Sequence, residues 1–439
     1  MIILENLLKL GKRIVPRPIF NFFQPIYHLL LIVSAVFWYR FPSRKMKIIG
    51  VTGTNGKSTV VHLISKILEE AGHSVAAFSS IEFKIKDKVW KNDLKMTMPG
   101  RFKLQKLLYQ AYKAGCEYVV LEVTSEGIKQ HRHRFIGFDI AVLTNLTEEH
   151  LESHGGFERY KQAKSKLFQM LKLKGSAIVN LDDLNAEYFL QFPAKEKWGY
   201  GIDFESSTEV NQTVKVSDYQ LSKKGISFRI DGKDFNVNLL GKFNLHNILA
   251  AVSVGLIEEI NLDKIKLALE KVNNISGRLE IVIKSPFLVI VDYAHTPDAL
   301  EKVYQMIREL FSSSPDGGTR RIIGVLGAAG GGRDKWKRVE FGKIAEKYLD
   351  KIIIANEDPY NEDPQAIIDD IAKGLKNRLA EKFIDRREAI HRALELAQDG
   401  DIVIITGKGC ESWLCVDKGK KIAWDDRKIV KEEMKKISN

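Results

Sequence analysis

The sequence predicts an α/β protein with two mostly parallel sheets, and three observations support that fold class. Short apolar runs of strand length alternate with longer segments of helical apolar spacing, in two successive series along the chain. A glycine-rich turn joins the first strand of the first series to the first helix. The 439 residues are enough for about two to four domains. Such alternation is typical of parallel sheets that helices cover on both faces.

The composition is that of an ordinary globular protein, with 44% hydrophobic and 28% charged residues. The 32 glycines and 11 prolines exclude a fibrous or largely disordered chain. Cys116, Cys410 and Cys415 form no C-x-x-C pair, which argues against a disulfide scaffold or a cysteine zinc ribbon and fits a reducing compartment. The net charge of +12 indicates an anionic partner: nucleic acid, a phosphorylated metabolite or a membrane surface.

Residues 1–45 form a hydrophobic and basic N-terminal appendage. No charged residue lies between Ile26 and Tyr39, the apolar character extends back to Ile19, and lysines and arginines flank the run on both sides. A run of about 10–14 apolar residues is shorter than the roughly 20 that a spanning helix needs. No small-x-small cleavage site of a signal peptide follows it. Residues 19–41 therefore have two interpretations: a membrane anchor, or a helix that packs on the following domain.

The first alternating series, residues 46–277, predicts a central domain. It begins with a buried strand at Lys47–Thr52 and a helix at Ser58–Ala71 with apolar residues at helical spacing. Further strands are expected at Ser74–Phe78, Tyr118–Glu122, Ile140–Leu143 and Ala177–Asn180, and helices at Leu104–Ala114 and Phe157–Leu171. Thr213–Leu239 alternates apolar and polar residues, as hairpins at a sheet edge do, and helices are expected at Leu245–Glu259 and Leu262–Val272.

The second series, residues 278–439, predicts a C-terminal Rossmann-like α/β domain. Its strands are expected at Leu288–Val291, Arg321–Leu326, Lys351–Ala355 and Asp401–Ile405. Its helices are expected at Asp298–Phe311, Lys335–Tyr348, Pro364–Leu379 and Arg387–Gln398. Ser312–Gly318 is rich in Ser, Gly and Pro and marks an exposed turn.

The segment Gly50-Val-Thr-Gly-Thr-Asn-Gly-Lys57-Ser58 lies between the first predicted strand and helix. Glycines there let backbone N–H groups face phosphate oxygens, and the helix N-terminus adds positive potential. Lys57 would reach the terminal phosphates and the Ser58 hydroxyl would ligate magnesium. Val51 stands at the first glycine position of the general phosphate-loop pattern. The strand–helix context nonetheless predicts nucleotide binding and a central domain of the P-loop type.

Two polar side chains follow neighbouring predicted strands: Glu122 closes one, and His150 follows another. In a parallel sheet, ligands collect at the carboxyl ends of the strands, so both can meet the magnesium that Ser58 would hold. Imidazole is an unusual ligand for that hard ion. Lys164 would face this cluster only if its helix packs there.

Several motifs of this chain resemble those of the Mur ligases. They are Gly53-Thr-Asn-Gly-Lys-Ser58, Glu122-Val-Thr-Ser-Glu-Gly127, Asn145-Leu-Thr-Glu-Glu-His-Leu151 with His154-Gly155, Gly241-Lys-Phe-Asn-Leu-His-Asn247, Gly277-Arg-Leu-Glu280, Asp292-Tyr-Ala-His-Thr-Pro-Asp-Ala299 and Gly407-Lys-Gly-Cys-Glu411. The order and spacing are most similar to the MurE branch, which adds the third residue of the peptidoglycan stem. The resemblance runs from about Lys47 to Arg427.

The resemblance implies an ATP-dependent amide ligase that works through an acyl phosphate on a UDP-muramoyl-peptide, with Mg²⁺, in the cytoplasm. Magnesium and lysines would neutralise the substrate carboxylate and the triphosphate, so that one can attack the other. By position, the resemblance assigns ATP binding to Gly53, Thr54, Asn55, Gly56, Lys57, Ser58, Asn247, Arg278, Asp292, Tyr293 and His295. It assigns catalysis to Lys57, Glu122, His150 and Lys164, and metal binding to Ser58, Glu122, His150 and Lys164, the last as a carbamate.

The substrate-binding positions match the family pattern less completely than the ATP-binding positions do. Thr97, Thr124, Ser125, Gln130 and Arg132 match muramoyl-peptide positions, although the usual Thr-Thr pair reads Thr-Met here and Glu126 replaces a histidine. Arg333, Glu357, Asp358, Pro359, Tyr360, Gly407 and Glu411 match amino-acid positions. The selector of diaminopimelate-adding enzymes, Asp-Asn-Pro-Arg, ends here in Tyr360, and Cys410 replaces a histidine. A tyrosine cannot form the bidentate pair that grips a distal carboxylate. We therefore predict weak use of diaminopimelate and better use of lysine.

The largest departure lies before the first strand. MurE proteins have there a domain of about ninety residues that holds the uridine diphosphate, whereas this sequence has the apolar and basic appendage. Either the uridine grip is lost, or a partner supplies it, or the substrate is presented differently, for example on a lipid carrier. An appendage that binds membranes would place the enzyme at the inner face of the membrane.

Alternatives remain open at this point. Related ligases of the cyanophycin or poly-glutamate type share the phosphate loop and join other amino acids. A non-catalytic nucleotide-binding scaffold at a membrane is a third interpretation, although a scaffold needs no metal ligands. Nucleic acid is not an expected partner, because no recognised module or aromatic–basic interleaving occurs.

Overall fold

The computed structural model describes residues 32–94, 96–204, 209–313 and 318–437. The expectations for residues 1–31, which contain most of the appendage, lie outside the described residues. Residues 32–38 are helical and are followed by the short helix η1 (Pro42–Lys45), which packs on α4 (Arg101–Lys113). Within the described ranges, no helix combines the length and apolar character needed to cross a membrane.

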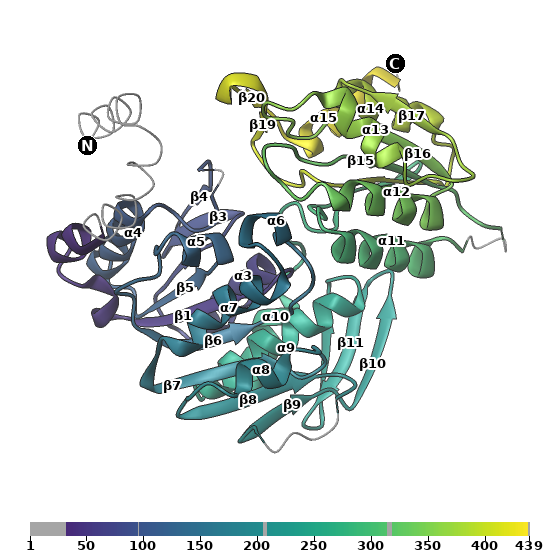
Figure 1. Ribbon diagram of the computed structural model, residues 1–439. Coiled ribbons are helices and arrows are strands. Elements are labelled where there is room, and N and C mark those ends of the chain that lie inside the picture. The colour runs from purple at the N-terminus through teal and green to yellow at the C-terminus, as the bar shows by residue number, and fades with distance from the viewer. Residues whose placement is uncertain (1–31, 95, 205–208, 314–317, 438–439) are drawn as a thin grey trace, which may run out of the picture.

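A nine-stranded sheet forms the centre of the first domain (Figure 1). Its strands are β1 (Lys47–Thr52), β2 (Val75–Phe78), β3 (Glu82–Ile85), β4 (Lys88–Lys91), β5 (Tyr118–Glu122), β6 (Phe138–Leu143), β7 (Leu171–Asn180), β8 (Glu196–Gly201) and β9 (Gln212–Lys215). Their order is β4-β3-β2-β5-β1-β6-β7-β8-β9, and only the β2–β3 and β3–β4 pairs are antiparallel. The sheet is therefore mixed but mostly parallel.

Two apolar clusters cover the two faces of this sheet. One contains α3 (Lys57–Glu70), α9 (Lys242–Ile257), α10 (Leu262–Glu270) and a three-stranded antiparallel sheet of β10 (Asp218–Ser222), β11 (Gly225–Ile230) and β12 (Lys233–Val237). The other contains α4, α7 (Phe157–Gln169) and α8 (Ala186–Leu190). The short helices α5 (Ser125–Lys129) and α6 (Leu151–His154) lie in the loops that follow β5 and β6.

The C-terminal domain has a six-stranded sheet in the order β13-β14-β18-β15-β16-β17. Its strands are β13 (Glu280–Ile283), β14 (Leu288–Val291), β15 (Ile322–Leu326), β16 (Lys351–Ala355), β17 (Ala380–Phe383) and β18 (Ile402–Ile405), and only β13 is antiparallel to its neighbour. One face is covered by α11 (Pro297–Phe311), α12 (Trp336–Tyr348) and α13 (Pro364–Ala372), the other by α14 (Arg386–Leu396) and α15 (Asp426–Ile437). A hairpin of β19 (Trp413–Cys415) and β20 (Lys421–Ala423), joined by η2 (Asp417–Gly419), completes the domain.

The predicted α/β class with mostly parallel sheets is confirmed, and β1, β5, β14 and β16 have the predicted bounds. The helix predicted over Pro364–Leu379 is wrong in its second half, because α13 ends at Ala372 and residues 380–383 form β17. The chain turns at Gly374, where its backbone packs directly on α12: a Cβ added to Gly342 would lie 2.1 Å from the Ile371 carbonyl oxygen. The stretch predicted as edge hairpins divides between β9, which joins the central sheet in parallel, and the separate antiparallel sheet.

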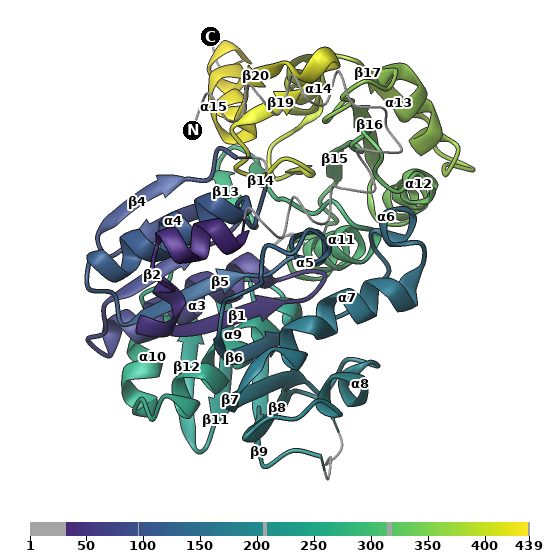
Figure 2. The same ribbon diagram turned by 60° about the vertical axis from the view of Figure 1, so that its left-hand side comes forward.

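The strand order explains where a site can form. β1 lies between β5 and β6, in parallel with both, so the turns that follow these three strands meet at one edge of the sheet. Ligands of open α/β sheets bind at this edge, outside the carboxyl ends of the strands. In Figures 1 and 2 the C-terminal domain faces this edge through the segments around α11 and α12.

Candidate active site

The phosphate loop connects β1 to α3 and has two glycines in the left-handed region. Gly53 has φ 145° and Gly56 has φ 82°. A Cβ on Gly53 would lie 1.9 Å from Thr144 Oγ1, and one on Gly56 would lie 2.2 Å from Asn247 Oδ1, so both positions require glycine. No side chain caps the N-terminus of α3. Lys57 and Ser58, the first residues of α3, line the cavity, so a helix start, where N–H groups have no intrahelical acceptors, lies beside it, as in an anion site at a helix N-terminus.

Lys57 and Ser58 follow the loop and converge on Glu122 at the end of β5. Ser58 Oγ donates to Glu122 Oε2 at 2.8 Å, and the Ser80 N–H donates to the same oxygen at 2.9 Å. Lys57 Nζ lies 3.9 Å from Glu122 Oε1 and donates to the Thr54 carbonyl at 2.8 Å. Burial lowers the pKa of Lys57, partly offset by the Glu122 charge. The sequence did not single out Ser80, which lies just beyond β2.

Lys164 reaches this cluster from α7. The condition stated for it in the sequence, that its helix packs beside the cluster, is therefore met. Its side chain is 2% exposed, and Nζ donates to the Gly53 carbonyl at 2.5 Å. Burial holds the pKa of Lys164 well below its usual range, and the nearby Lys57 charge lowers it further. His150 lines the same cavity, with a left-handed backbone, and burial lowers its pKa to about 2. A buried lysine near a second lysine is an environment that favours the uncharged amine.

The expected metal residues can be tested against this geometry. Ser58 and Glu122 place a hydroxyl and a carboxylate oxygen within hydrogen-bond distance of each other, which are oxygen ligands of the kind that Mg²⁺ prefers. His150 and Lys164 line the same cavity. Among the described residues, no group of three His, Cys, Asp or Glu side chains converges in the manner of a preformed metal centre. The oxygen pair therefore fits Mg²⁺ beside bound phosphates, where waters and phosphate oxygens complete the shell.

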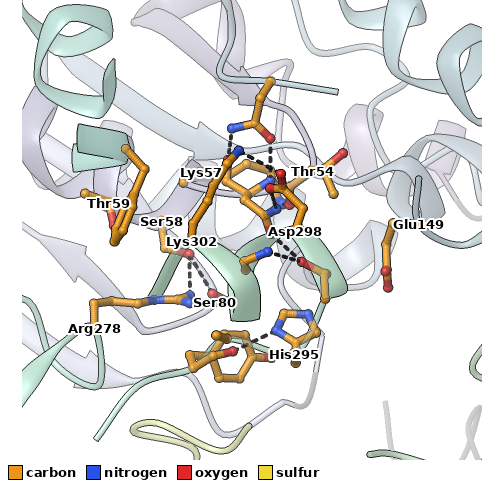
Figure 3. A pocket seen from close by; sticks show the side chains of 18 of the residues that line it. Thr54, Lys57, Ser58, Thr59, Ser80, Glu149, Arg278, His295, Asp298 and Lys302 are labelled. Carbon is orange, nitrogen blue, oxygen red and sulfur yellow. Dashed lines mark hydrogen bonds and ion pairs between the residues drawn. The ribbon is translucent and has the colours of Figure 1, made fainter. Parts of the chain in front are cut away.

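The C-terminal domain supplies the opposite wall of the cavity (Figure 3). The Arg278 guanidinium lies 4.4 Å from the centre of the Tyr293 ring, and its Nη2 is 3.4 Å from Ser58 Oγ. His295 Nδ1 lies 2.8 Å from the Tyr293 carbonyl oxygen. Asp292 is buried and accepts the Leu279 and Ala294 N–H groups at 2.7 Å each, so it shapes this turn.

Asn55 joins the phosphate loop to the C-terminal domain. Its Nδ2 donates to Asp298 Oδ2 at 3.0 Å, and its Oδ1 accepts from Thr296 Oγ1 at 3.2 Å. The two domains thus enclose a cavity of about 210 Å³ that nearly all the predicted ATP residues line. Gly53 contributes through its carbonyl group. Glu149, Asp298 and Lys302 also line the cavity, although the sequence did not single them out; the first two lie inside the motifs quoted above, and no pattern marked Lys302.

The predicted muramoyl-peptide residues divide into two groups. Thr97, Thr124 and Ser125 line the cavity. Gln130 and Arg132 do not: Arg132 donates to Gln130 Oε1 at 2.7 Å and to the Met98 carbonyl, behind the cavity wall. The structure therefore places these two beside the loop that carries Thr97 and not in the cavity itself.

The predicted amino-acid residues lie around two smaller cavities next to the first. Arg333 lines all three, and Asp358, Tyr360 and Glu411 line the second, of about 100 Å³. Glu357 and Gly407 line the third, whereas Pro359 lines none of these three.

Lys408 and a buried carboxyl set the charge in this region. Lys408 Nζ pairs with both Asp358 oxygens at 3.0 Å and with Glu411. Burial raises the pKa of Glu357 to about 7. The amino-acid region therefore combines Arg333 with carboxylates that Lys408 partly neutralises.

Fold and site together define a two-domain α/β protein whose phosphate loop lines a cavity of about 210 Å³ between the domains, with a smaller cavity alongside. A profile described as "Mur ligase middle domain" matches residues 51–255, and one described as "Mur ligase, glutamate ligase domain" matches residues 277–409. The chain belongs to the Mur ligase family, as the motifs predicted. It is an ATP-dependent ligase of the kind that joins an acid and an amino acid in peptidoglycan synthesis.

The relatives cover most of the chain. UDP-N-acetylmuramoyl-L-alanyl-D-glutamate–2,6-diaminopimelate ligase of Syntrophomonas wolfei is 38% identical over 413 residues, which are 92% of this chain and 81% of that protein. UDP-N-acetylmuramyl-tripeptide synthetase of Roseiflexus sp. is 36% identical, with the same coverage. A solved structure of a 2,6-diaminopimelate ligase of this kind has a TM-score of 0.58 and 29% identity, covering 90% of this chain and 79% of its own.

Proposed function

We propose that this protein uses ATP and Mg²⁺ to add a diamino acid to UDP-muramoyl-dipeptide, through an acyl phosphate. One observation carries the proposal: the phosphate loop, Glu122 and the buried Lys164 line a cavity that adjoins the Arg333–Tyr360–Glu411 cavity. The carboxylate to be activated would lie between them. The names of this protein's relatives make the muramoyl-dipeptide and 2,6-diaminopimelate the first substrates to test.

In this proposal, residues of the protein position the substrates and neutralise their negative charges. The phosphate-loop N–H groups and Lys57 hold the triphosphate, and Arg278 holds the face of the nucleotide turned to the C-terminal domain. Ser58, Glu122, His150 and Lys164 as a carbamate would hold Mg²⁺, which when bound neutralises charge on the transferred phosphoryl group. Thr97, Thr124 and Ser125 would orient the muramoyl-peptide carboxylate. Arg333, with the carboxylates around it, would orient the amino acid for attack.

The domain division is part of the proposal. We assign residues 46–277 to a central P-loop-type ATPase domain and residues 278–439 to a Rossmann-like C-terminal domain. The profile boundaries at residues 255 and 277 support the division, as does the left-handed Gly277 at the junction of the two domains. Gly277 has no room for a side chain, because a Cβ there would lie 2.2 Å from the Cys410 N.

A phosphate-release assay tests the function. Purified protein is incubated with ATP, Mg²⁺, UDP-muramoyl-dipeptide and one amino acid at a time, and the product is identified by mass. We expect release that requires both the dipeptide and the amino acid, with one amide formed per phosphate. Release that is independent of the muramoyl-dipeptide, or that proceeds with glutamate polymers instead, would favour the ligases of other amino-acid polymers.

We also propose that the appendage places the enzyme on an anionic membrane surface at the cytoplasmic face. One side of helix 32–38 packs inward, with Ile32, Ala35 and Val36 buried, so the packing interpretation holds for that side. Phe37 and Trp38 are 67% and 76% exposed on the other side. No acidic residue occurs from residue 6 to residue 68. Exposed aromatic rings among basic residues suit the interface of a bilayer with anionic lipids.

A further inference from the structure

The short helix α6 starts without a cap of its own. A helix start leaves backbone N–H groups without intrahelical acceptors, and a Ser, Thr, Asp or Asn side chain just before the helix usually accepts from them. His150 occupies that position here, has φ 56°, and makes no side-chain cap. The acceptors come from the other domain instead.

Asp334 of the C-terminal domain supplies both acceptors. Its Oδ2 accepts from the Leu151 N–H at 3.0 Å, and its Oδ1 accepts from the Glu152 N–H at 3.0 Å. Asp334 is 3% exposed, so these bonds satisfy a carboxylate that burial would otherwise destabilise. Figure 2 shows α6 next to α12 of the C-terminal domain, and hydrogen bonds from Lys129 to Ser153 and from Ser153 to Glu126 also hold α6 against α5.

Two further contacts join the same two segments. Lys337 Nζ pairs with Glu149 Oε1 at 2.8 Å with both side chains buried, and the Lys335 N–H donates to Glu152 Oε1 at 2.9 Å. The segment 149–152 thus contacts the segment 334–337 on both sides of His150. These contacts form a clamp, which we define as the four interactions that Asp334, Lys335 and Lys337 make with residues 149–152.

We infer that Asp334 is a positioning residue that sets His150 when the two domains are closed, and so couples occupancy of the amino-acid cavity to assembly of the phosphate site. Arg333, which lines all three cavities, is the neighbour of Asp334 in the chain, and His150 is the neighbour of the two capped N–H groups. A ligand that holds Arg333 in the closed arrangement also holds Asp334 against α6. Ligands at the two sites then favour the same closed state. The coupling rests on the proposed roles of Arg333 and His150, whereas the clamp itself does not.

The test compares Asp334→Asn with Asp385→Asn. Asp385 accepts from the Arg387 N–H at 2.7 Å and caps α14 within one domain, so it is a matched cap that joins no domains. Hydrogen exchange by mass spectrometry reports on residues 147–156 without any need for activity. In Asp334→Asn we expect exchange in that segment to be roughly 5- to 30-fold faster, as for a lost cap of ordinary strength. We expect no change there in Asp385→Asn.

Kinetics then separate positioning from simple stability. Asp334→Asn is expected to lower kcat and to raise the Mg²⁺ concentration for half-maximal rate, with the KM for ATP within about twofold and partial rescue in Asp334→Glu. Unchanged exchange in folded Asp334→Asn, or faster exchange with wild-type kinetics, overturns the inference. If Asp334→Asn does not fold, Lys337→Gln is measured in its place with the same two readouts. Faster exchange in a protein whose wild type lacks ligase activity would support the clamp and count against the proposed function.

Discussion

The phenolic hydroxyl of Tyr293 donates a hydrogen bond to Glu411 Oε1 at 3.1 Å. Tyr293 belongs to the motif that faces the phosphate loop, and Glu411 lines the amino-acid cavity. The bond therefore joins the nucleotide wall to the amino-acid wall within the C-terminal domain. Arg278 stacks on the same ring and reaches Ser58, so one aromatic side chain links both halves of the proposed reaction.

Lys57→Ala should abolish most of the ligase activity. Its ammonium is next to the phosphate loop and Glu122, where it would balance charge on the transferred phosphoryl group. We expect kcat to fall on the order of 10²-fold or more, as for other preorganised electrostatic contacts. Lys66→Ala, on an outward-facing position of the same helix, is the matched control and should keep wild-type rates. Full amide formation by Lys57→Ala would remove the assigned role.

Lys164→Ala should lose activity and recover part of it with added short carboxylic acids. A buried ammonium beside Lys57 would repel a metal ion, whereas a carbamate formed from the uncharged amine and CO₂ would be a ligand. A small acid can occupy the space and supply the missing carboxylate. Rescue is measured as phosphate release against acid concentration, with the exposed Lys166→Ala as control on the same helix. Full activity of Lys164→Ala without added acid would contradict the proposal that Lys164 acts as a carbamate.

Tyr360 should disfavour diaminopimelate relative to lysine. A phenol offers one hydroxyl where a guanidinium would hold the distal carboxylate through two parallel bonds. We expect a kcat/KM ratio of about tenfold or more in favour of lysine, because a hydrogen bond to a charged group contributes about 1.5–3 kcal/mol. Tyr360→Arg should shift the ratio toward diaminopimelate, and Tyr360→Phe should not. Several relatives are named as 2,6-diaminopimelate ligases. A clear preference of the wild type for diaminopimelate would contradict this prediction.

Glu357→Gln should flatten the pH dependence of stability. Burial raises the pKa of Glu357 to about 7, above the usual value of a glutamate. Between those two values the folded state keeps the proton and the unfolded state does not, so the free energy of unfolding falls as pH rises, by up to about 1.4 kcal/mol per unit. Urea unfolding at pH 5 and pH 8 measures the difference. Equal pH dependence in wild type and variant would mean that Glu357 is ionised throughout.

Phe37→Ser combined with Trp38→Ser should weaken binding to vesicles that contain phosphatidylglycerol. Both side chains are largely exposed, and removal of two rings lowers insertion at the interface without touching the cavities. Leu379→Ser, at a fully exposed apolar position of the C-terminal domain, is the control and should sediment with vesicles as the wild type does. If the wild type binds neutral and anionic vesicles equally weakly, the membrane proposal is contradicted, and helix 32–38 serves only to pack on the protein.

The sequence by itself determined several strands of the parallel sheets and the phosphate loop, but not the strands β8 and β17. Lys47–Thr52, Tyr118–Glu122 and Lys351–Ala355 are apolar runs with unambiguous ends, and buried parallel strands are continuous apolar segments of this length. Glu122 at the end of β5 and His150 in the segment between β6 and α6 also followed from the sequence, because parallel strands place their carboxyl ends at one edge.

Tertiary structure alone decided three features. Lys164 reaches Gly53 only because α7 packs over β6 and β7, and local patterns do not state where a helix docks. Gln130 and Arg132 pair with each other outside the cavity, although their residue types suit substrate contacts. Asp334 caps α6 across 182 residues or more of chain, and no spacing rule predicts a partner at that separation. The physical reason is the same each time: short-range periodicity specifies which face of an element is apolar, whereas contacts between elements depend on how whole domains close on each other.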